Sequence, residues 1–199
     1  MSLRIEQDGR LKRITLAIPA KRNVLDAALA QDFLREMAEA GVDAATGAIL
    51  IEADGPMFCG GLDPASPPSP DLFTIRQRAA KPIIVAVKGA AVSAGVALIA
   101  NAHIVIAAQG CTFGLVDIRQ GRWDEGVYQA VAAAIGQRRA MELALTGRIF
   151  STADAAVWGL VHMIAPAIEL DDRATEIATA LANANPEVVR AAMSHSRNA

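Results

Sequence analysis

The chain has 199 residues, of which 53% are hydrophobic, 20% charged and 4% aromatic, and its formal net charge is −2 at pH 7. This length and composition predict one folded domain with a substantial core, and they exclude a largely disordered chain. Basic residues never form a run longer than a pair. The charge pattern therefore excludes an electrostatic footprint for nucleic acid or for an anionic membrane surface.

Few residues in the sequence can form disulfides or bind a metal. The two cysteines, Cys59 and Cys111, cannot supply a disulfide framework and indicate a reducing compartment. The three histidines, His103, His162 and His195, are far apart in the sequence and show no metal-ligand spacing. The opening residues are polar and charged, which differs from a secretory signal. We therefore expect a cytoplasmic protein without a bound metal.

The N-terminal third alternates strand and helix patterns. Alternating apolar residues predict a strand at 11–18, helical spacing predicts an amphipathic helix at 24–40, and the apolar run AILIEA predicts a buried strand at 48–53. Prolines after Asp63 cannot continue a helix, so we expect a mobile loop up to about residue 69.

The rest of the chain contains short strands and then helices. The pattern predicts a helix at 71–80, a buried strand at 82–87, a small-residue turn at 89–94, a helix at 95–102 and a strand at 103–107. It then predicts helices at 127–135, 137–145, 151–159, 171–184 and 186–196. The uncharged stretch 89–108 is about long enough to span a membrane. Its abundant Gly and Ala and its lack of basic flanks favour a buried element instead.

Two loops have small residues between a buried strand and the start of a helix. They are CGGLD at 59–63 and GAAVSAG at 89–95. Such a junction leaves backbone N–H groups unpaired and directed outward, and two adjacent junctions can stabilise a developing oxyanion. The alternative is that small residues only allow tight strand–helix packing.

Several stretches, in order, resemble the motifs of the crotonase, or enoyl-CoA hydratase/isomerase, superfamily. They are PAKRNVL at 19–25, FCGGLD at 58–63, KPIIVAVKG at 81–89, FGLVDIRQG at 113–121 and the helical pattern at 136–161. The resemblance covers about residues 11–195. It implies an α/β fold, the ClpP/crotonase spiral of strand–strand–helix turns with a C-terminal helical region. The whole chain, 1–199, would form one domain, with a spiral core to about 147 and a helical trimerisation region at about 148–199.

The resemblance also implies a substrate and an assembly. The substrate would be an acyl-CoA thioester, with coenzyme A as part of the substrate and no separate cofactor, in a role such as fatty acid metabolism. The expected assembly is a homotrimer or a dimer of trimers. Residues 66–70 replace a longer segment of the family, and the sequence stops before the family's closing C-terminal helices, so the resemblance implies a fold that is truncated relative to the family.

By position in the family motifs, the thioester carbonyl would lie between two backbone N–H groups, those of Leu62 and Ala94. These would form the oxyanion hole and stabilise an enolate or oxyanion. Substrate-binding positions carried over in the same way are Arg22, Val24, Gly61, Asp63, Pro64 and Ala65.

The acidic residues decide which reaction the resemblance implies. Hydration in this family uses two carboxylates, and Asp117 matches one of them while Ala97 stands at the other. Glu125 occupies a position that carries an acid in the dienoyl-CoA isomerase and chlorobenzoyl-CoA dehalogenase branches. Asp117 and Glu125 are therefore candidate catalytic residues, one of them with a raised pKa; the alternative is that Glu125 is a solvated loop residue. Hydration, isomerisation and thioester hydrolysis all remain open.

Two alternatives belong to other functional classes. The chain could be a non-catalytic crotonase-fold homologue that binds acyl-CoA. The stretch AVSAG around Ser93 also resembles the nucleophile elbow of Clp-type serine peptidases. That mechanism needs a histidine near the Asp117 segment, and the sequence has none there, so we interpret Ser93 as a small loop residue. Cys59 likewise has no nearby base.

Overall fold

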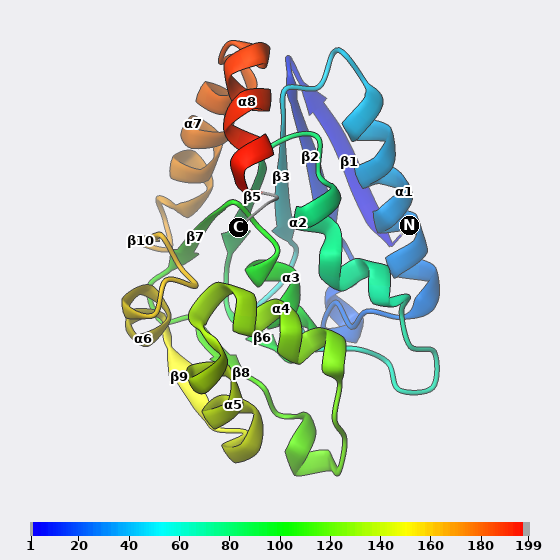
Figure 1. Ribbon diagram of the computed structural model, residues 1–199, viewed down its shortest axis with the longest axis vertical. Coiled ribbons are helices and arrows are strands. Elements are labelled where there is room, and N and C mark those ends of the chain that lie inside the picture. Colours follow the sequence, from blue (N-terminus) through cyan, green and yellow to red (C-terminus); the bar gives the residue numbers. More distant parts are fainter. Residues whose placement is uncertain (1, 197–199) are drawn as a thin grey trace.

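The computed structural model describes residues 2–196 and contains two sheets (Figure 1). The larger sheet has the strand order β1-β2-β3-β5-β7-β10, with bounds Leu3–Asp8, Leu11–Leu16, Ala48–Ala53, Ile83–Val87, Ile104–Ala108 and Met163–Ala165. The smaller sheet has the order β4-β6-β8-β9, with bounds Met57–Cys59, Ala90–Val92, Thr112–Gly114 and Ile149–Ser151. Only the β1–β2 and β8–β9 pairs among these are antiparallel.

Helices follow the strands in a regular order. The α-helices are α1 (Ala27–Val42), α2 (Ile75–Arg78), α3 (Ala94–Ala100), α4 (Glu125–Ile135), α5 (Gln137–Thr146), α6 (Thr152–Val157), α7 (Leu170–Ala182) and α8 (Pro186–Ser196). Short 3-10 helices are η1 (Pro19–Lys21), η2 (Pro70–Thr74) and η3 (Asp117–Gln120). Three times, a strand of the large sheet leads to a strand of the small sheet and then to an α-helix: β3, β4, α2; β5, β6, α3; and β7, β8, α4. This is the spiral unit that the sequence predicts.

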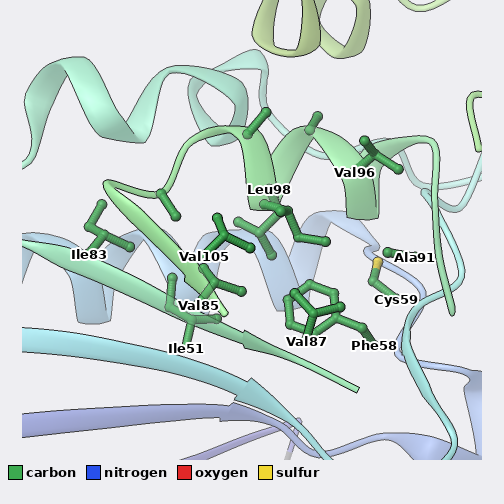
Figure 2. Close-up of a cluster of buried hydrophobic side chains, with 14 of the residues drawn as sticks. Ile51, Phe58, Cys59, Ile83, Val85, Val87, Ala91, Val96, Leu98 and Val105 are labelled. Atoms are coloured by element: carbon green, nitrogen blue, oxygen red, sulfur yellow. The ribbon is translucent and has the colours of Figure 1, made fainter. Parts of the chain in front are cut away.

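The large sheet separates two layers of helices. On one face, Arg13 of β2 donates to the Thr175 hydroxyl of α7, which fixes α7 over β2 and β3. On the opposite face, Leu98 of α3 points toward Val85 and Val105 of the sheet (Figure 2). These side chains are fully buried, and burying one aliphatic side chain contributes about 1.5–3 kcal/mol. This packing holds the short α3 against the sheet.

Some predicted elements differ from the observed ones. The sequence analysis missed β1 because every residue after Leu3 in this strand is exposed, so the apolar signal of a strand is weak. It interpreted residues 89–94 as a turn, whereas 90–92 form β6 between β4 and β8. The helix predicted to start at 127 begins at Glu125, because the Asp124 carboxylate accepts from the Val127 N–H at 2.9 Å and caps it. The capping box at Ser151 is confirmed.

The apolar stretch at 89–108 folds as β6, α3 and β7 inside the domain. Within residues 2–196, no helix has both the length and the apolar character needed to cross a bilayer.

Candidate active site

The first of the two small-residue loops is held by a short bridge to the segment before α1. The Leu25 N–H donates to the Gly61 carbonyl at 2.8 Å, and the Asp63 N–H donates to the Leu25 carbonyl at 2.8 Å. In such a bridge, the residue between the two bonded positions directs its own N–H away from the partner. That residue is Leu62, and within residues 2–196 its N–H has no hydrogen-bond acceptor.

Asn23 of the PAKRNVL stretch fixes the position of this loop. It is fully buried with a φ of 50°, a left-handed conformation that Asn tolerates better than most residues. Its Oδ1 accepts from the Ile18 N–H, and its Nδ2 donates to the carbonyls of Asp54 and Met57, each at 2.9 Å. Asn23 therefore acts as a clamp that joins the segment between β2 and α1 to Asp54 and to the start of β4.

The second loop ends at the first residue of α3. Ser93 has a φ of 48°, and its N–H donates to the Gly114 carbonyl at 2.7 Å. Ala94 follows at the first helical position, where an N–H has no partner inside the helix. The hydrogen bonds of the described chain include none donated by the Ala94 N–H.

The two loops lie against each other. A Cβ added at Gly61 would lie 3.7 Å from the Val92 carbonyl oxygen and 3.8 Å from the Ser93 Cβ. A Cβ added at Gly95 would lie only 2.8 Å from the Cys59 Cβ and 2.9 Å from the Cys59 carbonyl oxygen, so this approach requires glycine. Two unpaired N–H groups, of Leu62 and Ala94, are therefore carried by neighbouring loops.

The predicted substrate-binding residues surround the first loop. Arg22 is exposed and Val24 is half-buried, and a Cβ at Gly60 would lie 3.1 Å from both the Arg22 carbonyl oxygen and the Val24 Cγ2. The next residues form a turn, in which the Asp63 carboxylate accepts from the Ala65 N–H at 2.9 Å. Pro64 and Ala65 are exposed, and Gly61 is buried between the two loops. The loop predicted up to about residue 69 is followed by η2, which begins at Pro70.

Asp117 is a mostly buried carboxylate. It is 8% exposed at the start of η3, and its Oδ1 lies 3.2 Å from Nη2 of Arg122. The Arg122 N–H also donates to the Asp117 carbonyl at 3.0 Å, so the two residues are joined twice. The carboxylate lines a small cavity of about 20 Å³ together with Trp123 and Tyr128. The sequence analysis missed Arg122, because its partner becomes evident only when η3 turns back on itself.

Glu125 lies in a different environment. It is exposed in the first turn of α4, and its carboxylate accepts from Trp123 Nε1 at 3.0 Å and from Gln129 Nε2 at 2.6 Å. The Gln129 hydrogen bond, followed by that of Trp123, lowers the pKa of Glu125. Within the described chain, Glu125 does not line the cavity beside Asp117. The raised pKa that a shared acid–base pair would need is absent at this residue.

The other residues singled out in the sequence offer no second acid or nucleophile. Ala97 is fully buried in α3 and carries no proton-transfer group. The Ser93 hydroxyl is buried and makes no hydrogen bond within residues 2–196, so no base activates it there. Burial raises the pKa of the Cys59 thiol to about 12, which keeps it protonated near neutral pH. Within the described residues, no group of side chains has the composition of a metal site.

Comparisons with known proteins agree with this architecture. The family model described as enoyl-CoA hydratase/isomerase matches residues 6–199. The chain is 32% identical over 194 residues to mevalonyl-coenzyme A hydratase sidH of Aspergillus fumigatus, covering 90% of this chain and 72% of that protein. It is 31% identical over 200 residues to the probable enoyl-CoA hydratase echA8 of Mycobacterium bovis, covering 94% of this chain and 78% of that protein.

A solved structure is similar over the whole chain. The enoyl-CoA hydratase of Mycobacterium avium superposes with a TM-score of 0.88 at 30% identity, covering 100% of this chain and 88% of that one. The predicted α/β spiral fold is therefore confirmed.

Proposed function

The chain belongs to the enoyl-CoA hydratase/isomerase, or crotonase, family, and from that premise we propose that it transforms an acyl thioester of coenzyme A by stabilising negative charge on the thioester oxygen. The Leu62 and Ala94 N–H groups donate to that oxygen and act as the oxyanion hole. Each donor of this kind contributes on the order of 10²–10³ in rate. The observation that supports this role most directly is that both amides lack an internal acceptor while the loops that carry them are in contact.

Asp117 is the proposed proton carrier. Arg122 holds its carboxylate in one orientation, which a proton transfer with a defined direction requires. In an isomerisation, Asp117 takes a proton from Cα of a 3-enoyl thioester, and the electron pair moves onto the carbonyl oxygen. The same carboxyl then returns the proton to Cγ, and a 2-enoyl thioester results.

One carboxylate with an oxyanion hole can also support addition of water to a 2-enoyl thioester. The relatives compared above are named hydratases, which favours hydration as the second candidate reaction. A hydration mechanism that needs two carboxylates does not fit, because Ala97 stands in the middle of α3 and the Glu125 carboxylate is exposed and bonded to Trp123 and Gln129.

The experiment is a mass-spectrometric screen of acyl-CoA thioesters with the purified protein. Hydration adds one water to the mass, isomerisation changes only the retention time, and hydrolysis releases coenzyme A. Replacing Asp117→Asn should lower turnover by about 10²–10⁴-fold, since the side chain keeps its shape but no longer accepts a proton.

Glu125→Gln is the matched control for this experiment. It removes a carboxylate from the same region and should leave turnover within about threefold, because this residue is exposed and bonded to its own helix. An equal loss in both variants would restore the two-acid hypothesis. Saturable binding of the thioesters without conversion of any of them would instead support the non-catalytic acyl-CoA-binding homologue.

We also propose that the chain assembles as a homotrimer or a dimer of trimers. Exposed apolar side chains lie on two elements that pack together, Ile118 of η3 and Leu145 of α5, and Ile149 of β9 follows α5 closely in the chain. Exposed apolar residues grouped in this way favour a protein contact. Light scattering coupled to size exclusion measures the mass, and a purely monomeric mass would contradict the assembly.

A further inference from the structure

A second polar cavity lies at the other end of α3 from the Ala94 amide. It has a volume of about 290 Å³ and is lined by the last residues of α3, by the residues that lead into β7 and β10, by α2 and by the end of α4 (the elements are labelled in Figure 1). Three side chains with hydrogen-bond donors border it: Arg76, His103 and His162. Within residues 2–196, no acidic residue lines this space, which we call the His–Arg cavity.

The two histidines are held by the same pair of backbone contacts. The His103 N–H donates to the Ile83 carbonyl at 2.9 Å, and the His103 Nδ1 accepts from the Ile83 N–H at 3.1 Å. The His162 N–H donates to the Val105 carbonyl at 2.9 Å, and the His162 Nδ1 accepts from the Val105 N–H at 3.0 Å. Each imidazole therefore extends the pairing of two parallel strands where these strands begin.

These contacts determine where each ring carries its proton. A backbone N–H can only donate, so the Nδ1 atoms of His103 and His162 hold lone pairs and the proton of each neutral ring is on Nε2. Burial, and then the charge of Arg76, lowers the pKa of both rings, that of His103 to about 4. Both rings are thus neutral N–H donors at pH 7. A metal ion would need the Nε2 lone pair, which this tautomer does not offer.

Arg76 supplies a positive charge to the same cavity. The backbone N–H of Arg76 donates to Oδ1 of the buried Asn101 at 3.2 Å, and Asn101 Nδ2 donates to the Phe73 carbonyl at 3.0 Å. These two hydrogen bonds anchor the start of α2 to the end of α3. The Arg76 guanidinium forms no ion pair or hydrogen bond with any described residue. Its Nε and the Nε2 of His103 are both buried without an acceptor.

Unpaired buried donors are costly, and each one in a native structure calls for an explanation such as a bound water or ion. Here the Arg76 Nε and the His103 Nε2 are two such donors, and the exposed His162 ring borders the same space. The charge of Arg76 acts on both rings. Water can accept from these donors but cannot offset the charge. An anion does both, and the cavity is several times larger than the roughly 30 Å³ that one water occupies.

We propose that the His–Arg cavity binds a small oxyanion of the phosphate class, held by the Arg76 guanidinium and by the Nε2–H groups of His103 and His162. The ion is either free or the terminal group of a larger molecule. This binding is separate from the chemistry at the Leu62 and Ala94 amides, and it does not depend on which acyl-CoA reaction the protein performs.

The test is a titration of the full chain, labelled with nitrogen-15 in its histidines, with inorganic phosphate, followed by NMR of the ring nitrogens. We expect the Nε2–H signals of His103 and His162 to shift together and to saturate. Arg76→Gln should weaken the affinity about tenfold or more, because one charge-assisted hydrogen bond is lost.

Arg78→Gln is the matched control in the same helix. The Arg78 guanidinium donates to the Asp71 carbonyl and to the Thr74 hydroxyl, and it does not border the His–Arg cavity. The affinity of this variant for phosphate should be unchanged. In His103→Asn, the amide oxygen can still accept from the Ile83 N–H, but the shorter side chain lacks the Nε2–H donor of the imidazole. Binding, followed at His162, should weaken several-fold.

A second titration with adenosine monophosphate distinguishes the two sources of the anion. Saturable shifts with the nucleotide at lower concentration than with phosphate identify the terminal group of a larger ligand, whereas shifts with phosphate alone identify a free ion. The proposal is overturned if phosphate produces no saturable shift, or if it binds Arg76→Gln as well as it binds Arg78→Gln. The cavity would then hold only water. Because the readout is binding rather than turnover, this result is independent of the proposed enzymatic function.

Discussion

The two ends of α3 differ in how they present hydrogen-bond donors. At the first residue, the Ala94 N–H and the neighbouring Leu62 N–H are main-chain groups left over from strand and helix pairing. At the last residues, the donors are the side chains of Arg76, His103 and His162. A main-chain site depends on how closely two loops approach each other, and a side-chain site depends on residue identity. Substitutions that change how closely the loops approach should therefore impair the main-chain end, whereas the side-chain end should be impaired when Arg76, His103 or His162 is replaced.

The largest expected effect is on the main-chain end. In Gly95→Ala, the added Cβ would lie 2.8 Å from the Cys59 Cβ, so α3 must move and the Ala94 N–H moves with it. We expect kcat on the best acyl-CoA substrate to fall by about 10²–10³-fold, the contribution of one oxyanion donor. Steady-state kinetics measure this change.

Gly41→Ala is the control for this substitution. Gly41 lies in α1, where a Cβ would make an ordinary 3.7 Å contact with the Ala80 Cβ, so activity should be retained. Full activity in Gly95→Ala would show that the position of the Ala94 amide is irrelevant to turnover.

The clamp that supports the first loop should have the next largest effect. Asn23→Ala leaves the Ile18 N–H and the Asp54 and Met57 carbonyls without their buried partner. We therefore expect the free energy of unfolding to fall by about 2–4 kcal/mol. Urea denaturation measures this loss.

The same substitution at the exposed cap residue Asn185, whose Oδ1 accepts from the Glu187 N–H, should cost only about 1 kcal/mol. Equal losses at the two positions would argue against a special role for Asn23.

The free energy of unfolding should depend on pH through His103, at the side-chain end of α3. The pKa of His103 is about 4 in the folded chain against 6.5 as its ordinary value. The unfolded chain therefore binds more protons between these values, and stability rises with pH from about 4 to 6.5 and is lost as the pH falls. Moving from pH 7 to about 4.5 should cost about 2–3 kcal/mol through this residue.

His103→Asn has no titrating group and should lack this part of the pH dependence. Comparing urea unfolding of the two proteins at both pH values isolates the contribution of His103, because His162 is present in both. If the difference in stability between them does not change with pH, the buried neutral state of His103 is contradicted.

The smallest expected effect on activity is that of replacing the Leu62 side chain, because this residue donates through its main-chain N–H. Leu62→Ala keeps the N–H and the bridge between Leu25 and its neighbours, so kcat/KM should stay within about threefold of the parent value. A loss comparable to that of Gly95→Ala would mean that the Leu62 side chain, rather than its amide, serves the reaction.

Much of the fold could be predicted from local sequence pattern. The apolar run at 48–53 coincides with β3, and the Ser151–Asp154 capping box marks the start of α6, because both signals come from residues next to each other in the chain. The exposed strand β1 carried no such signal, since it is defined by its antiparallel pairing with β2. Asp117 was identified by its motif, but its contact with Arg122 was not.

The sequence by itself determined the family, the buried strands β2, β3, β5 and β7, most of the helices, and the two small-residue loops from which the unpaired amides come. The tertiary structure alone decided which donors remain without partners. His103 and His162 are far apart in the chain, and they border one cavity only because His162 pairs with β7 and His103 pairs with β5. Hydrogen bonds between segments that are distant in the chain decide which donors remain unpaired, and local sequence pattern does not predict these hydrogen bonds.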